Sequence, residues 1–160
     1  MQSLYLGDKT TYGQIGPEHL LLAARSQHIQ RWKIPRDAYP IDRLGYLKWR
    51  ATLKEYHSKI STNILVETGY DQPTIEKVRN LILKKNFPND SESRVLEDAL
   101  CIVFLKFQLL PFSTKTSDEK TINALKKSWS KMTEHGRKVA LNFDYDVKSK
   151  SLIEKALSDI

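Results

Sequence analysis

The sequence predicts an all-α fold in a single compact multi-helix bundle, and three observations support this prediction. Apolar residues recur three and four positions apart along most of the chain, which is the spacing of one helix face. Serine or aspartate precedes several of these segments, as helix N-caps do. No hairpin-type dipeptide separates two stretches of alternating apolar residues. We expect an irregular segment over residues 1–16 and one all-helical domain over residues 17–160.

The first predicted helix begins at Pro17 and extends to about Trp32. Pro35 and Pro40 then enforce a non-helical connection over residues 34–42, because proline fixes φ and disfavours the helical conformation of the residue before it.

Two helices are predicted next, at residues 45–67 and 71–86. Gly69 is a suitable end for the first of them, because glycine readily adopts the left-handed conformation that closes many helices. Asp71 or a neighbouring residue is the expected N-cap of the second.

In the second half of the chain, the sequence predicts a central helix over residues 91–110, which Pro111 is expected to end. Ser117 begins the next helix, and the two acidic residues that follow it suit the helix dipole. Gly136 lies within or between shorter helical pieces, and a final helix ends near Leu157.

The composition favours acidic or phosphate-bearing partners, because the formal net charge is +7. The most apolar stretch, residues 99–110, is shorter than the roughly 20 residues of a membrane-spanning helix, so no membrane insertion is expected. Cys101 lies inside this stretch and is expected in the core; a lone cysteine excludes an internal disulfide. Without a recognisable signal segment, the cytoplasm is the expected compartment, with the mitochondrion as the alternative.

Three polar residues occupy helix faces that are otherwise apolar: His28, His57 and Asp98. A buried carboxylate is costly unless a partner satisfies it. Two imidazoles and a carboxylate that converge in a bundle suit a divalent metal ion (Mn, Fe, Zn or Ni), and Glu97 could then position or deprotonate water. The structural alternative is two histidines satisfied within the core and an Asp98–arginine pair.

The segment from Arg25 to Arg50 is basic and interleaved with aromatic residues. Arginine binds phosphate oxygens in a bidentate manner, and aromatic faces stack on bases or guanidinium groups. The candidate phosphate-binding residues are Arg25, Arg31, Arg36, Arg43 and Arg50. The candidate stacking residues are Trp32, Tyr39 and Trp49. The alternative is that these arginines stack on the aromatic rings for structural reasons.

The run AARSQHIQRWKIPRDAYPIDRLGYLKWR, followed by LEDALCIVFL, resembles an uncharacterised domain-of-unknown-function family of bacteria and fungi. The resemblance extends from about Leu4 to the C-terminus and implies an all-helical domain. It also implies that the chain begins later than typical members.

The chain is also distantly similar to HD-domain phosphohydrolases, which bind a divalent metal in a helical bundle. The resemblance implies that His28, His57 and Asp98 are the metal ligands, in that order along the chain. Ser58 departs from the pattern, because HD domains have aspartate after the second histidine. The interval from His57 to Asp98 is also shorter than in HD domains.

Two functional hypotheses remain from the sequence. The first is a metal-dependent phosphohydrolase-like domain that acts on a nucleotide or another small phosphate ester. The alternative is a non-catalytic binding module, or an accessory subunit of a larger complex, that docks RNA or an acidic protein partner through residues 25–50.

Overall fold

The computed structural model describes residues 16–158, and the chain divides into two compact units. The first unit contains the described residues 16–87 and the second contains residues 88–158. All regular secondary structure among the described residues is helical, which confirms the predicted all-α class. The single-domain organisation and the HD-like bundle stay predictions. The predicted irregular segment 1–16 lies, except for its last residue, outside the described residues.

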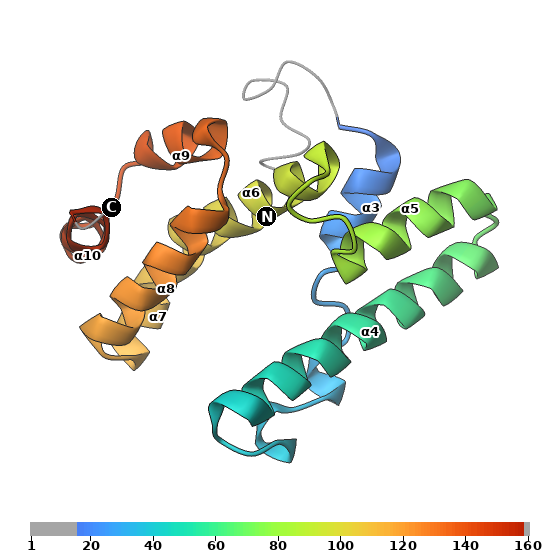
Figure 1. Ribbon diagram of the computed structural model, residues 1–160, viewed down its shortest axis with the longest axis horizontal. Coiled ribbons are helices and arrows are strands. Elements are labelled where there is room, and N and C mark those ends of the chain that lie inside the picture. Colours follow the sequence, from blue (N-terminus) through green and yellow to red (C-terminus); the bar gives the residue numbers. More distant parts are fainter. Residues whose placement is uncertain (1–15, 159–160) are drawn as a thin grey trace. The chain divides into compact units, whose positions relative to one another are not determined.

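The first unit is built from three α-helices and two short 3-10 helices (Figure 1). In chain order they are α3 (Glu18–Ser26), η1 (Arg31–Lys33), η2 (Arg36–Ala38), α4 (Arg43–Glu67) and α5 (Gln72–Leu83). Helices α4 and α5 pack side by side, and α3 packs against both. The turn between α4 and α5 contains Gly69, whose φ of 81° lies in the left-handed region expected there.

Helix α3 ends at Ser26, six residues before the predicted end at Trp32. Residues 27–30 form a turn in which Gln30 adopts a left-handed φ of 50°. Side chains of α4 hold this turn by hydrogen bonds to Ile29 and Gln30. The helical spacing of the sequence was therefore overridden by contacts that no local pattern contains.

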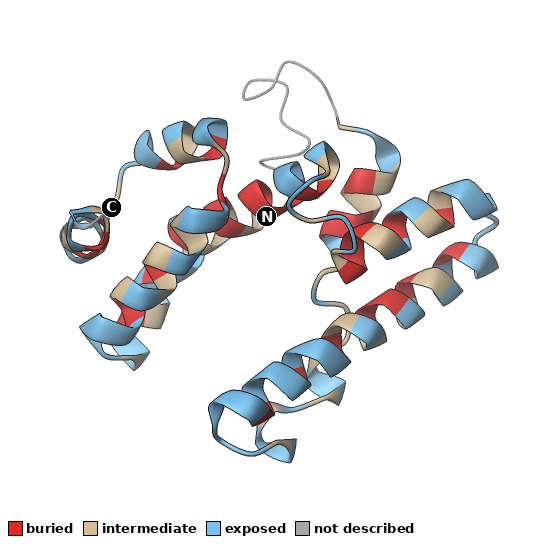
Figure 2. Cartoon of the chain, viewed as in Figure 1, coloured by how far each residue is buried: buried red, intermediate tan, exposed pale blue. Residues whose placement is uncertain are grey.

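The buried stripe of α4 consists of residues four positions apart: Trp49, Leu53, His57 and Ser61. Figure 2 shows that the first turns of this helix are otherwise mostly exposed, whereas its later turns bury residues against the rest of the unit. The N-cap is Asp42, whose Oδ1 accepts a hydrogen bond from the Gly45 amide at 2.6 Å.

The second unit continues the chain as a long helical segment followed by three further helices (Figure 1). Its elements are α6 (Ser91–Val103), the π-helical η3 (Phe104–Gln108), α7 (Leu109–Lys115), α8 (Asp118–Lys131), α9 (Glu134–Leu141) and α10 (Val147–Leu157). Helix α10 packs on α7 and α8, and α9 packs on α6. The N-caps of α6 and α8 are Asp90 and Ser117, at the predicted starts of these helices.

Pro111 does not stop the central helix, contrary to the prediction, because helical structure continues to Lys115. The π-helical residues 104–108 change the hydrogen-bond register just before it. Pro111 consequently lies in the first turn of α7, where the missing backbone N–H is tolerated.

Among the described residues, no helix is both long enough and apolar enough to cross a membrane.

Gly45→Ala is expected to destabilise the protein, because the backbone of Pro40 lies close to Gly45 in the first turn of α4. A Cβ at Gly45 would lie 2.1 Å from the carbonyl oxygen of Pro40, which is backbone and cannot rotate away. The substitution ordinarily stabilises a helix interior by about 0.5–1 kcal/mol. Here we expect a loss of about 1–3 kcal/mol in unfolding free energy, measured by urea denaturation. Lys48→Ala, at an exposed position of the same helix, is the control and should change it by less than about 0.5 kcal/mol. Equal stability of the two variants would contradict the contact.

Candidate functional site

Three side chains on one face of α4 fasten the preceding connector to the helix. The Trp49 Nε1–H donates to the carbonyl of Ile34 at 2.9 Å. The Tyr56 hydroxyl donates to the side-chain oxygen of Gln30 at 2.9 Å, and His57 Nδ1 lies 2.8 Å from the carbonyl of Ile29. The connector therefore has a fixed position on the surface of the first unit.

Two guanidinium groups also contact the ring of Trp49. The Arg31 Cζ lies 4.9 Å from the ring centroid and the Arg36 Cζ lies 5.9 Å from it. Arg36 additionally donates to the carbonyls of Tyr39 and Pro40 at 2.9 and 2.8 Å. Trp49 and both arginines thus have partners within the protein, as the structural alternative predicts, and Arg36 has backbone partners in addition.

His28 and His57 lie side by side in the first unit, with ring centroids 6.4 Å apart and nearly perpendicular planes. His57 is only 4% exposed. Its Nδ1 must carry the proton, because the Ile29 carbonyl can only accept a hydrogen bond. Burial lowers the pKa of His57, the bond to Ile29 opposes this shift, and Arg31 and Arg50 lower it further. A neutral His57 leaves the Nε2 lone pair available.

The pKa of His28 is lowered to about 4, first by burial and then by Arg31, His57, Arg50 and Lys84. The side chain of His28 is exposed and lies in the turn after α3, so the predicted position on a core-facing helix stripe is wrong, because α3 ends at Ser26. The imidazole is neutral at pH 7. Because the unfolded chain takes up this proton near the ordinary value of 6.5, the contribution to stability is present above pH 6.5 and is lost as the pH falls toward 4.

Arg31 and Arg50 bring positive charge to this histidine pair. Burial lowers the pKa of Arg31, and the charge of Arg50 lowers it further. Among the described residues, neither guanidinium forms an ion pair with a carboxylate. We call His28, His57, Arg31 and Arg50 the histidine–arginine cluster.

The other candidate residues of the basic segment are close to this cluster in the sequence, but no described contact joins them to it. Arg25 is exposed in the last turn of α3, and Arg43 is the exposed first residue of α4. Tyr39 is half-buried, and its carbonyl accepts from Arg36. Trp32 is 76% exposed.

Sequence analysis missed three residues that shape the cluster. Gln30 and Tyr56 hold the turn that carries His28, and Lys84 contributes positive charge from the left-handed C-cap of α5. Lys84 could have been found as a basic residue at the end of a predicted helix. The contact between Gln30 and Tyr56 spans 26 residues and leaves no signal in the local pattern.

Asp98 belongs to the second unit, where it is 2% exposed and binds the start of α9. Its Oδ1 accepts from the Thr133 amide at 2.8 Å and its Oδ2 accepts from the Thr133 hydroxyl. A Cβ at Gly136 would lie 2.5 Å from the carboxylate, so the close approach requires glycine. Asp98 therefore has a structural partner, although this partner is a threonine and not the arginine of the structural alternative.

Glu97, the predicted catalytic carboxylate, is also buried in the second unit. Lys131 places its Nζ 4.0 Å from Glu97 Oε2. Among the described residues, no three His, Cys, Asp or Glu side chains gather in a way that could hold a metal ion. The predicted metal site of His28, His57 and Asp98 stays a prediction, as does the role of Glu97.

Comparison with known proteins gives one match. The family model described as "Domain of unknown function (DUF4202)" matches residues 11–153. The chain belongs to this family. No curated protein and no solved structure matches the chain. The match confirms the resemblance to a domain-of-unknown-function family, and assigns no chemistry to this DUF4202 chain.

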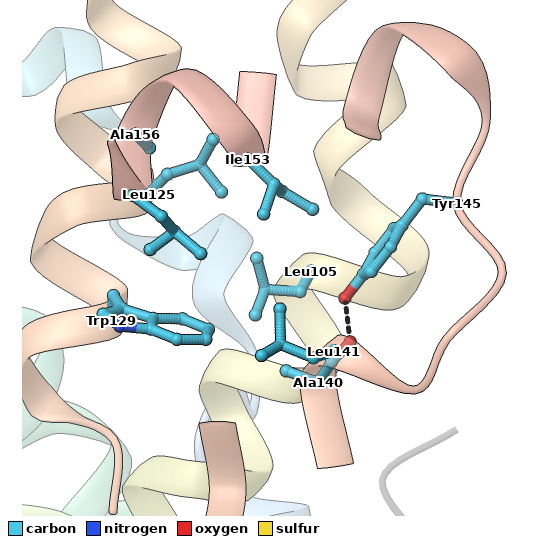
Figure 3. Close-up of a pocket in the computed structure, with 9 residues that line it drawn as sticks. Leu105, Leu125, Trp129, Ala140, Leu141, Tyr145, Ile153 and Ala156 are labelled. Carbon is cyan, nitrogen blue, oxygen red and sulfur yellow. Dashed lines mark hydrogen bonds between the residues drawn. The ribbon is translucent and has the colours of Figure 1, made fainter. Parts of the chain in front are cut away.

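A small apolar cavity lies in the second unit (Figure 3). Its volume of about 10 Å³ is the minimum that one water molecule needs. Leu105, Trp129 and Tyr145 line it, and the Tyr145 hydroxyl donates to the Ala140 carbonyl at 2.8 Å. Burial raises the pKa of Tyr145 to about 12. The cavity is a packing gap in the core and offers no room for a ligand.

The bonds of Asp98 predict that Thr133→Val destabilises the DUF4202 chain. The variant removes the hydroxyl that donates to Asp98 and accepts from the Gly136 amide at 3.0 Å. A buried carboxylate oxygen and a helix-capping amide then lose their partner, which costs about 2–4 kcal/mol. Thr133→Ser keeps the hydroxyl and should lose less than about 1 kcal/mol. Chemical denaturation measures both; similar losses for valine and serine would show that the hydroxyl contributes nothing.

Proposed function

We propose that this DUF4202 chain is a binding module that recognises a phosphate-bearing ligand through the histidine–arginine cluster. The observation that carries the proposal is that Arg31 and Arg50 both lower the pKa values of the paired histidines, while neither forms an ion pair with a carboxylate among the described residues. Like charges held together raise the free energy of the ligand-free protein. An anion that binds both guanidinium groups relieves this repulsion.

The orientation of Arg31 supports phosphate as the anion. Its Cζ lies over the Trp49 ring, 4.9 Å from the centroid, and this cation–π contact uses no N–H donor in a hydrogen bond. The N–H donors lie along the edge of the guanidinium plane, in a fork that matches two phosphate oxygens. Stacking therefore orients Arg31 without consuming the donors that would bind the ligand.

The neutral histidines fit the same role. An imidazole provides one N–H donor when it is neutral and two when it is protonated. A bound phosphate lowers the cost of protonating His28, because its negative charge offsets the cations that, after burial, lower this pKa to about 4. Binding is thus expected to be accompanied by proton uptake at mildly acidic pH.

The second candidate is the metal-dependent phosphohydrolase implied by the HD resemblance. It is favoured by His57, whose Nδ1–H donates to a backbone carbonyl, an arrangement common in metal-binding histidines. Within the first unit, however, the charged groups that act on the histidine pair are cations, which oppose a divalent ion. Asp98, the third predicted ligand, accepts two hydrogen bonds from Thr133. The residues present therefore fit an anion better than an HD metal ion.

Titration with inorganic phosphate and ribose 5-phosphate tests the first proposal. Arg50→Ala and Arg31→Ala each remove a charge-assisted contact and should weaken binding by about tenfold or more in isothermal titration calorimetry. Lys59→Ala removes an exposed positive charge from the same helix, outside the cluster, and should leave the affinity within about twofold at physiological salt. Equal losses in all three variants would indicate non-specific charge attraction and contradict a defined site.

Elemental analysis of protein purified without chelator or histidine tag separates the two candidates. The binding-module proposal predicts no near-stoichiometric transition metal, also after incubation with manganese, zinc, iron or nickel. A near-stoichiometric metal that is lost in His57→Ala would instead support the metal-dependent enzyme.

A further inference from the structure

We infer that the ligand is a nucleotide, either free or within a single-stranded RNA, and that Trp32 stacks on its base. This inference rests on the proposed phosphate site and adds a second recognition element to it. The two sources share a phosphate and an aromatic base, and the experiment below distinguishes them.

The first observation is that Trp32 differs from the two other tryptophans of the chain. Trp49 is buried and carries Arg31 and Arg36, and Trp129 carries Arg137, with Cζ at 5.6 Å from the ring centroid. Trp32 is 76% exposed, and its large aromatic surface is open to solvent. Single exposed apolar residues are common on protein surfaces, so exposure alone assigns no role.

The surroundings of Trp32 give it one. It is the central residue of η1, directly between Arg31 of the cluster and Lys33. In a 3-10 helix with three residues per turn, neighbouring side chains point about 120° apart. The indole of Trp32 therefore does not cover the guanidinium of Arg31, whose neighbour it is in the chain. A ligand held by its phosphate on Arg31 needs a spacer to reach this ring, and the ribose of a nucleotide provides one between the phosphate and the base.

The backbone beneath Trp32 is fixed before any ligand binds. The Lys33 amide donates to the Gln30 carbonyl at 3.0 Å, and the Ile34 carbonyl accepts from Trp49. The Gln30 side chain is held by Tyr56. A short segment anchored at both ends presents its exposed ring at little cost in conformational entropy, as a stacking platform must.

A second exposed aromatic side chain lies beside Trp49, the ring over which Arg31 lies. Tyr46 is 47% exposed, and its ring centroid lies 5.9 Å from that of Trp49. Cationic donors interleaved with exposed aromatic rings are the arrangement by which proteins hold nucleotides without reading their sequence. An inorganic phosphate or a sugar phosphate uses only the cationic half of this arrangement.

The test compares ligands that differ only in the base. Adenosine 5′-monophosphate should bind the full chain about tenfold more tightly than ribose 5-phosphate, because one base stacks on Trp32. Trp32→Ala should abolish this difference and leave the affinity for ribose 5-phosphate unchanged. Trp32→Phe keeps a stacking face and should retain part of it. Leu44→Ala, at another exposed apolar position of the first unit, is the matched control and should retain all of it.

The outcomes separate this inference from the proposed function. If ribose 5-phosphate binds and the base adds no affinity, the inference is wrong and the phosphate site stands. If neither ligand binds the wild-type chain, the phosphate site itself is wrong. The last experiment measures the affinity for a short single-stranded oligoribonucleotide. Binding tighter than that of the mononucleotide, with the same loss in Trp32→Ala, identifies RNA as the source of the nucleotide. Equal affinity identifies the free nucleotide.

Discussion

Trp49 is the residue on which the candidate site depends. Its indole N–H binds the connector at Ile34, and its ring carries Arg31 and Arg36. The segment between α3 and α4 contains two prolines and no buried residue, so it depends on this anchor for its position. The bonds from Tyr56 and from the neighbouring histidine extend the same attachment by two turns of α4. One face of one helix therefore determines where the basic segment presents its charges.

This attachment divides the arginines of the segment into two functional groups. Arg36 is consumed by backbone carbonyls, so it stabilises the connector. Arg31 and Arg50 remain as close positive charges, and with them two imidazoles whose pKa values lie below the ordinary range. Groups whose pKa values are shifted by burial and by neighbouring charges are concentrated at functional sites. The formal net charge of +7 of the whole chain is weaker support for an anion site than these positive charges around the histidine pair.

The fold could be predicted from local signals, because caps and helical spacing are local. Asp71 and Ser117 cap helices at predicted positions, and Asp90 caps α6 directly before its predicted first residue. The errors lie where distant contacts or register changes decide, as at the early end of α3 and the passage through Pro111. The site was predictable only as a set of residues. Polarity on an apolar face drew attention to His28 and Asp98 alike, yet the structural partner of Asp98 is 35 residues away in sequence.

The pKa of His28 with and without phosphate tests the central claim most directly. Proton NMR of the imidazole follows His28, and His28→Gln assigns the signal. The account predicts a pKa of about 4 in the free protein and an increase of at least about one unit when phosphate saturates the site, because the bound anion stabilises the imidazolium. The increase should persist in Lys59→Ala and disappear in Arg50→Ala. An unchanged pKa at saturating phosphate would contradict an anion site at the histidine–arginine cluster.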